Sequence, residues 1–293
     1  METEQGLHRY RDADSWPVAE GLAAMLENQV NSFAAVRDAL PALEGAVLAA
    51  AERLRAGGGR LVYAGAGASA RLAVQDGVEL HPTFGWPHER LRYLVAGGEG
   101  ALVRSVEGAE DDAEAGRREL LALRPGSGDV LLSVAASGTT AYTRAVQAAA
   151  RDAGTLTVAF ANNPGAPLLD GADHKVLLRT GPEFLAGSTR MTAGTAQKIA
   201  LNLFSTRLMT ELGRVHRGLM VDMVPANAKL VGRAHRMVAT IAGVDEGEAA
   251  AAWERAGRNV KRAVLMLRGL GPAEADARLA AANGRLSAAL HGP

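Results

Sequence analysis

The first third of the chain alternates apolar and polar positions with the period of amphipathic helices. Between Val18 and Arg55, apolar residues recur at steps of three and four. They are Leu22, Met25 and Leu26, followed by Val36, Leu40, Leu43, Val47 and Leu48. Three glycines, Gly57 to Gly59, end this stretch. We therefore expect a helical lead-in over residues 1–57.

After the glycines, short apolar runs alternate with helical stretches. The runs are Leu61 to Ala64, Leu91 to Val95, Val130 to Val134, Leu156 to Phe160 and Val176 to Leu178. Strands that alternate with crossover helices predict an α/β fold with a doubly wound parallel sheet of four or five strands. In such a sheet the ligand binds at the carboxyl ends of the strands, so the loops that follow the runs are the candidates for chemistry.

The remainder of the chain reads as helical. Seven apolar residues share one face of a long helix that ends near Gly213: Ala196, Ile199, Ala200, Leu203, Phe204, Leu208 and Leu212. The tail is rich in Ala, Arg and Glu and is broken near Gly243, Gly269 and Gly284. We predict a sheet domain over residues 58–228 and a small all-α domain over 229–293.

Composition excludes several classes of protein. The 293 residues carry no net charge and are 48% hydrophobic, which favours a folded globule and gives no field to gather nucleic acid. The start is polar rather than a secretory signal, and no apolar run reaches membrane length. Cysteine is absent, so disulfides and thiolate nucleophiles are excluded. We expect a cytoplasmic protein with no membrane or nucleic-acid partner.

Two loops are suited to hold an anion. The first, Gly65 to Arg71, contains Gly67 and Ser69 and follows the first strand; the second, Ala135 to Thr140, follows the third. Glycine-rich turns and helix N-termini present N–H groups to a phosphate. The second loop adds Ser137, Gly138, Thr139 and Thr140.

The same loops are compatible with two other functions. The first loop also fits the dinucleotide fingerprint, but the acidic residue that should hold a ribose is missing after the second strand, where Ala96-Gly97-Gly98 stands. Alternatively, the hydroxyl residues merely cap the following helices. Two such loops in one sheet favour a phosphate site.

Acidic side chains supply the candidate acids and bases. Glu79 lies near the end of the first crossover helix, and Glu107 and Glu110 belong to a charged cluster after the second strand. Two carboxylates in one cleft can act as acid and base, although a charge run is usually a solvated surface. His81 is a further candidate, although a lone histidine beside proline is more often structural. The histidines show no metal-binding spacing, so we predict no metal site.

Taken together, these motifs resemble the N-acetylmuramic acid 6-phosphate etherases, in the sugar-isomerase (SIS) domain superfamily. The resemblance runs from about Ala46 to Leu290. It rests on Gly58 to Gly67, Asp76 to Gly85, Val106 to Asp111, Ala135 to Gly138, Gly187 to Lys198, Gly218 to Asp222 and Arg258 to Lys261. The block from Gly187 to Lys198 is the most specific of them.

The resemblance implies a homodimeric lyase of amino-sugar metabolism and peptidoglycan recycling that needs no metal or organic cofactor. Such an enzyme expels D-lactate from carbon 3 of the sugar and adds water, which leaves N-acetylglucosamine 6-phosphate. Carried over by position, Glu110 is the base at carbon 2 and Glu79 protonates the departing lactate. Ser188 and Lys198 join the loop residues as substrate-binding candidates.

This chain departs from the family pattern in its loops. Ala68 and Ala70 flank Ser69 where the pattern is Gly-Thr-Ser-Gly-Arg, and Thr139 stands where an arginine is usual. Lost hydroxyl and guanidinium contacts weaken anion binding. Two alternatives therefore stay open: a regulator that binds a sugar phosphate without turnover, and a sugar-phosphate isomerase or other lyase.

Overall fold

The structure is a computed structural model, and it describes residues 1–291. The chain divides into two compact units. The first comprises Met1–Gly77 and Glu89–Ser205, and the second comprises Val78–His88 and the residues from Thr206 onward. The domain borders expected from the sequence, after residues 57 and 228, remain predictions.

The helical lead-in consists of α1 (Val18–Asp38) and α2 (Leu40–Arg55), as the apolar period predicted. The buried face of α1 includes the polar residues Asn28 and Ser32. Its large apolar side chains instead face solvent: Val18, Leu22, Leu26, Val30 and Phe33 are 61–79% exposed. The helix period is therefore correct, but in a single chain this apolar stripe covers no core.

The sheet has five parallel strands in the order β2-β1-β3-β4-β5. They are β1 (Leu61–Gly65), β2 (Leu91–Val95), β3 (Val130–Val134), β4 (Leu156–Ala161) and β5 (His174–Leu177). The doubly wound sheet is thus confirmed. Strand β5 begins two residues before the expected apolar run, because a half-exposed edge strand carries polar residues such as His174 that hydrophobicity does not mark.

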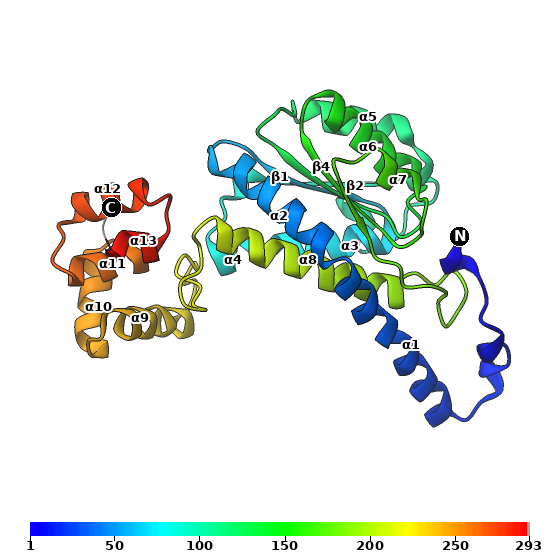
Figure 1. The fold of residues 1–293 in the computed structure, drawn as a ribbon, viewed down its shortest axis with the longest axis horizontal. Coiled ribbons are helices and arrows are strands. Elements are labelled where there is room, and N and C mark those ends of the chain that lie inside the picture. The colour runs from blue at the N-terminus through cyan, green and yellow to red at the C-terminus, as the bar shows by residue number, and fades with distance from the viewer. Residues whose placement is uncertain (292–293) are drawn as a thin grey trace. The chain divides into compact units, whose positions relative to one another are not determined.

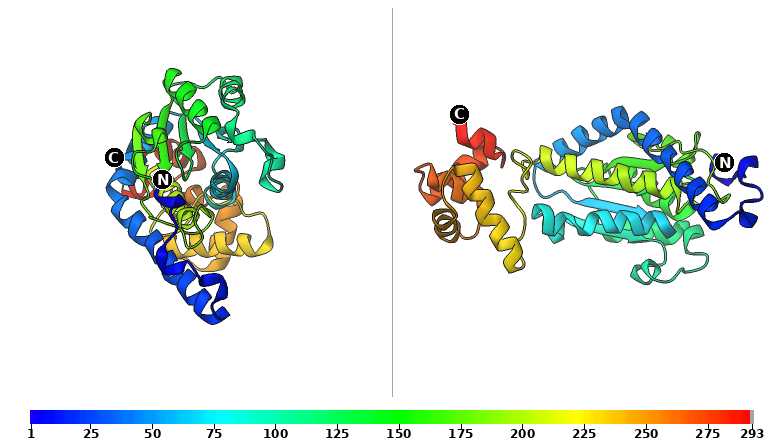
Figure 2. Two further views of the ribbon diagram at one scale, coloured as in Figure 1. Left: turned by 90° about the vertical axis from the view of Figure 1, so that its right-hand side faces the viewer. Right: turned by 90° about the horizontal axis from the view of Figure 1, so that it is seen from below.

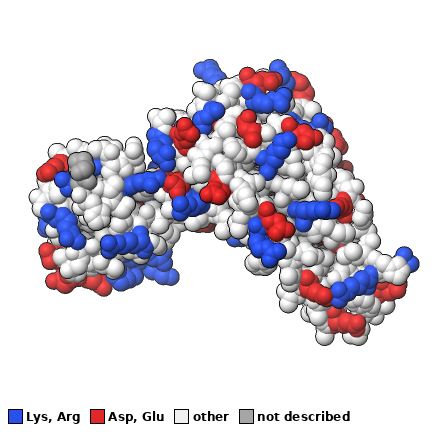
Figure 3. All heavy atoms as spheres, in the orientation of Figure 1, with Lys and Arg blue, Asp and Glu red and all other residues white. Residues whose placement is uncertain are grey.

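Helices cover both faces of this sheet (Figures 1 and 2). One face carries α5 (Ala113–Ala122), α6 (Ala141–Asp152) and α7 (Pro167–Asp170). The other carries α2, α3 (Gly67–Val78) and the part of α8 (Thr192–Glu211) that lies in the first unit. Strands β1, β3 and β4 are buried along their whole length, which explains their continuous apolar runs. Acidic and basic side chains intermingle over the face shown in Figure 3.

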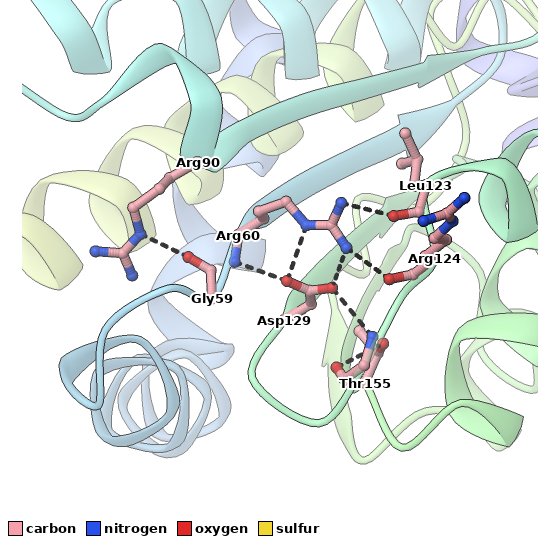
Figure 4. Close-up of polar contacts among 8 residues, drawn as sticks. Gly59, Arg60, Arg90, Leu123, Arg124, Asp129 and Thr155 are labelled. Carbon is pink, nitrogen blue, oxygen red and sulfur yellow. Dashed lines mark hydrogen bonds and ion pairs between the residues drawn. The ribbon is translucent and has the colours of Figure 1, made fainter.

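An ion pair fastens the amino-terminal ends of β1 and β3 (Figure 4). The Asp129 carboxylate accepts bonds from Arg60 Nε at 3.1 Å, Arg60 Nη2 at 2.6 Å and the Arg60 backbone N–H at 2.8 Å. The guanidinium also donates to the carbonyls of Leu123 and Arg124 at 2.7 and 3.0 Å. Burial raises the pKa of Asp129, but its bonds to Arg60 outweigh burial and hold that pKa below its ordinary value.

The second unit is all helical and has a core of its own, centred on residues such as Trp253 and Val264. Its helices are α4 (Leu80–Phe84), α9 (Ala228–Ala242), α10 (Glu246–Arg255), α11 (Val260–Leu267), α12 (Pro272–Ala281) and α13 (Leu286–His291). Asn227, Asp245 and Asn259 cap α9, α10 and α11 by accepting a backbone N–H three residues on. The predicted small helical domain is therefore confirmed as a fold. No helix in the described part of the chain is long and apolar enough to cross a membrane.

Candidate active site

A cavity of about 360 Å³ opens in the first unit beyond the carboxyl ends of β1 and β2. Ala66 and Gly67, which follow β1, form one wall together with Arg71 of α3. Ala96, Ala101 and the segment 105–110, which follow β2, form the other. The site therefore lies at the sheet edge where the fold predicts a ligand.

The acidic residues of the loop after β2 lie in two different surroundings. Glu107 and Glu110 both line the cavity, and Glu110 lies on a short 3₁₀ helix, Ala109–Asp111. Asp112 instead caps α5, where its carboxylate accepts the Ala115 N–H at 2.8 Å. The charge run is exposed to solvent, and Glu107 and Glu110 also belong to the same cavity lining as Gly67.

A tight backbone turn brings this loop over the strand ends. Gly97 has φ +83°, a conformation that favours glycine. A Cβ at this position would lie 2.8 Å from the Cβ of Val106, a distance that real contacts do not reach. A side chain at position 97 would therefore displace the segment that carries Glu107 and Glu110.

Arg71 was not among the site residues proposed from the sequence, yet it lines the cavity. Its guanidinium donates to the carbonyls of Leu102 and Ala101, each at 3.0 Å. Those bonds tie the loop after β2 to helix α3. Arg71 thus braces the cavity wall, and only the remaining N–H groups of its guanidinium are left to meet a ligand.

The loop after β3 begins beside the loop after β1, because Val134 and Gly65 are paired in register. Gly138 has φ +68°, and a Cβ there would lie 2.4 Å from the Cβ of Ala166. The Ser137 hydroxyl oxygen accepts bonds from the Thr139 N–H and hydroxyl at 3.1 and 3.0 Å. Thr140 precedes α6 without a side-chain capping bond.

These loop residues do not all occupy the same cavity. Gly67 and Glu110 line the cavity between β1 and β2, whereas the residues of the β3 loop lie outside its lining. Ser69 lies in the first turn of α3 and is only 8% exposed. The Thr140 side chain does not cap α6, so the capping interpretation is wrong for this residue. The hydroxyl groups of the β3 loop lie beside the strand ends.

Lys198 is exposed, and it contacts the edge of a buried polar network that sequence patterns did not indicate. The Asp76 carboxylate is 5% exposed and accepts bonds from Tyr63 Oη at 2.8 Å, Asn202 Nδ2 at 2.6 Å and Ser205 Oγ at 2.9 Å. The Lys198 ammonium donates to Asn202 Oδ1. Burial and the neighbouring Asp76 raise the pKa of Tyr63 well above its ordinary value, so this phenol stays a donor.

The N-terminus of α8 is already occupied by a carboxylate of the chain itself. Glu183 is fully buried, and its oxygens accept the backbone N–H groups of Thr192 and Ala193 at 2.8 and 2.9 Å. Ser188 lies in the turn before this helix, and its N–H donates to the carbonyl of Leu185 at 2.9 Å. A further anion at this helix end would meet the negative charge of Glu183.

Glu79 belongs to the second unit, at the junction of α3 and α4, where its side chain is exposed. The His81 ring nitrogen Nδ1 lies 2.9 Å from the carbonyl of Trp86, and the ring stacks on His88 with centroids 3.8 Å apart. These contacts hold the His81 ring in place, which fits a structural role. Among residues 1–291, no three His, Asp or Glu side chains are grouped for a metal ion.

The chain is similar in sequence to known proteins with a SIS domain and to curated etherases. Residues 45–150 match the glucokinase regulatory protein N-terminal SIS domain. An N-acetylmuramic acid 6-phosphate etherase from Deinococcus radiodurans is 51% identical over 96% of this chain and 92% of its own length. Etherases of the same name from Cronobacter sakazakii and Rubrobacter xylanophilus are 46% and 45% identical over 95% and 94% of this chain. The alignments cover 94% and 91% of those two proteins.

Among solved structures, a phosphoheptose isomerase from Francisella tularensis aligns with a TM-score of 0.49 and 16% identity, over 67% of this chain and all of that one. The sequence relatives, by contrast, are similar across both units. This chain belongs to the N-acetylmuramic acid 6-phosphate etherase family.

Proposed function

We propose that this protein is an N-acetylmuramic acid 6-phosphate etherase, a carbon–oxygen lyase that releases D-lactate and leaves N-acetylglucosamine 6-phosphate. The observation that carries the proposal is the 51% identity to a protein of that name along 96% of the chain. The cavity lined by Glu110 at the carboxyl end of the sheet supports it, because the reaction needs a carboxylate base beside a bound sugar.

The proposed reaction has two stages. In the first, the open-chain aldehyde acidifies carbon 2, Glu110 takes that proton, and the bond between carbon 3 and the ether oxygen breaks. The bond's electron pair leaves with lactate, which receives a proton from Glu79. In the second, water adds across the new double bond, with its oxygen at carbon 3 and a proton at carbon 2. A protonated leaving group is required because an alkoxide departs poorly.

The substrate phosphate is proposed to lie against the loops after β1 and β3. The register that pairs Gly65 with Val134 supports this placement, because it sets two glycine turns side by side. Lys198 supplies a cation whose position is set by Asn202. The proposed binding residues are Gly67, Ser69, Ser137, Gly138, Thr139, Thr140, Ser188 and Lys198.

The test uses two neighbouring carboxylates that line the same cavity. Glu110→Gln should slow lactate release by roughly 10²- to 10⁴-fold, the usual worth of a general base. Glu107→Gln is the matched control and should retain activity within a few-fold. Product formed in water enriched in oxygen-18 should carry the label at carbon 3 after anomeric exchange is washed out. Unchanged lactate release in Glu110→Gln would refute the assignment of the base.

A second variant distinguishes the role of Glu79 from that of Glu110, and the same assay distinguishes the etherase from the alternative functions. In deuterated water, Glu79→Gln should still exchange the proton at carbon 2 while it loses lactate slowly, because proton removal precedes departure of the leaving group. If the wild-type protein exchanges this proton but never releases lactate, it is an isomerase or another lyase. Saturable binding of the substrate with neither exchange nor release would identify a regulator.

We also propose that the protein is a homodimer. The exposed apolar stripe on α1 supports this, because Leu26 and Phe33 are 71% and 67% exposed, and patches of this kind mark interaction sites. In sedimentation velocity, Leu26→Glu should give a monomer. Val103→Glu, at a site that is 87% exposed outside the stripe, should leave the dimer intact. A wild-type monomer at every concentration would contradict the proposal.

The proposed location is the cytoplasm, with which the absence of cysteine from the sequence is compatible. We propose no nucleic-acid partner. The zero net charge supports this, as does the mixing of acidic and basic side chains on the face in Figure 3.

A further inference from the structure

The helical second unit contains a cavity of about 610 Å³, and among residues 1–291 the charged residues that line it are all basic. Three arginines and two histidines line it: Arg217, Arg268, Arg278, His216 and His291. None of these residues lines the cavity beside Glu110.

Acidic side chains of the described residues do not neutralise the three guanidinium groups. Within residues 1–291, none of them forms an ion pair or a side-chain hydrogen bond. Two acids of the same unit are already engaged, since Glu211 pairs with Arg285 at 2.7 Å and Asp222 with Lys261 at 2.7 Å. Unpaired arginines that converge on a concave surface are the usual means of recognising phosphate.

His216 adds a largely buried imidazole to the basic lining. It is 6% exposed, and its Nε2 atom has no hydrogen-bond partner among the described residues. The backbone of His216 exchanges two 2.9 Å hydrogen bonds with Leu219, which fixes the ring's attachment to the cavity wall. Burial and then the charge of Arg217 lower the pKa of His216, and an anion near Arg217 would offset the second cause.

The rest of the lining indicates the size and nature of the ligand. Ser287 adds a hydroxyl, and Ile241, Leu270 and Leu290 add an apolar wall. The volume exceeds that of a phosphate ion alone, so a carbon skeleton is expected to accompany the anion. We propose that this cavity is a binding site for a small phosphomonoester, held through the guanidinium groups of Arg217, Arg268 and Arg278.

The test follows the seven histidines of the full-length chain by NMR, with nitrogen-15 in the imidazole rings and inorganic phosphate as the probe. Two ring signals should move saturably, and one of them should be the signal that is missing from His291→Gln. The double variant Arg268→Gln/Arg278→Gln should raise the half-saturating phosphate concentration at least tenfold, since each lost charge-assisted bond weakens binding severalfold or more. No substrate turnover is needed, so the outcome is independent of the proposed etherase activity.

Two further variants test whether the phosphate response depends on the arginines of this cavity rather than on misfolding or on any arginine of the unit. Arg217→Gly removes a guanidinium at a position where φ is +48°, so glycine fits the backbone and the variant should fold. It should also weaken the phosphate response. Arg255→Gln, on the exposed end of α10, is the matched control and should respond as the wild type does.

The proposal is overturned if the arginine variants keep the wild-type response. It is equally overturned if chloride at the same ionic strength moves the same signals, because the effect would then be screening. Loss of lactate release by the folded double variant in phosphate-free buffer would also overturn it, because these arginines would then serve the catalytic substrate.

Discussion

Replacing Asp129 with alanine tests how the sheet is held at its amino-terminal end. The substitution removes a carboxylate whose side chain is 7% exposed and which accepts bonds from Arg60 and from the Gly126 N–H. It leaves the Arg60 guanidinium, itself only 20% exposed, without its counter-charge. Breaking a buried pair in this way costs about 3–5 kcal/mol of unfolding free energy. For a chain of this size, that corresponds to a fall in Tm of roughly 6–20 °C.

The assay is thermal unfolding followed by circular dichroism. The matched control is Asp170→Ala, because Asp170 pairs with Lys175 at 3.8 Å while both side chains are more than half exposed. That variant should change stability by less than about 1 kcal/mol. Equal Tm values for the two variants would refute the reasoning.

The stabilising effect of Asp129 should also depend on pH. Because its pKa is lowered in the folded state, the carboxylate stabilises the fold fully above its unfolded pKa, and this contribution is lost as pH falls through the folded pKa. The difference in stability between wild type and Asp129→Ala should therefore narrow below about pH 4. A constant difference in stability down to the lowest measurable pH would show that the charge of Asp129 does not cause the loss of stability in Asp129→Ala.

Three further substitutions have defined outcomes. Gly138→Ala should cost about 1–3 kcal/mol of stability and weaken substrate binding, since its new Cβ would meet Ala166 at 2.4 Å; thermal unfolding and KM report both. Asp76→Asn should raise KM by a factor roughly ten times larger than the factor by which it lowers kcat, because it disturbs the network that orients Lys198. A fall in kcat with no change in KM would contradict this. Lys261→Met should destabilise the second unit by about 1–3 kcal/mol in urea unfolding, because it leaves Asp222 with the more distant Arg214, at 3.8 Å, and removes the donor to the Gly284 carbonyl; an unchanged midpoint would contradict it.

Hydrophobic periodicity was sufficient to predict most of the fold. The continuous apolar runs of β1 and β3 are typical of strands buried on both faces, and each lies within one residue of its predicted limits. The edge strand β5 was placed less well because its polar residues follow no apolar pattern. Periodicity also could not reveal that Leu22 and Leu26 are exposed, since an apolar face looks the same whether its own core or a second chain covers it.

The candidate site was only partly predictable. Loops that follow strands can be located from sequence, which is why Gly67 and Glu110 were proposed and were then found to line one cavity. The bond between Asp76 and Asn202 joins residues 126 positions apart, and no local pattern encodes such a contact. The role of Glu183 at the start of α8 was likewise hidden, because a single glutamate nine residues before a helix resembles any other surface acid.

The exposed stripe on α1 also has a consequence for the protein at low abundance. If a second copy covers Leu26 and Phe33, mass action makes resistance to heat rise with protein concentration. Dilute or newly synthesised chains would then display this apolar helix to proteases and to other unfolded proteins. Expression level would in that case set not only how much enzyme is present but also how long each molecule persists.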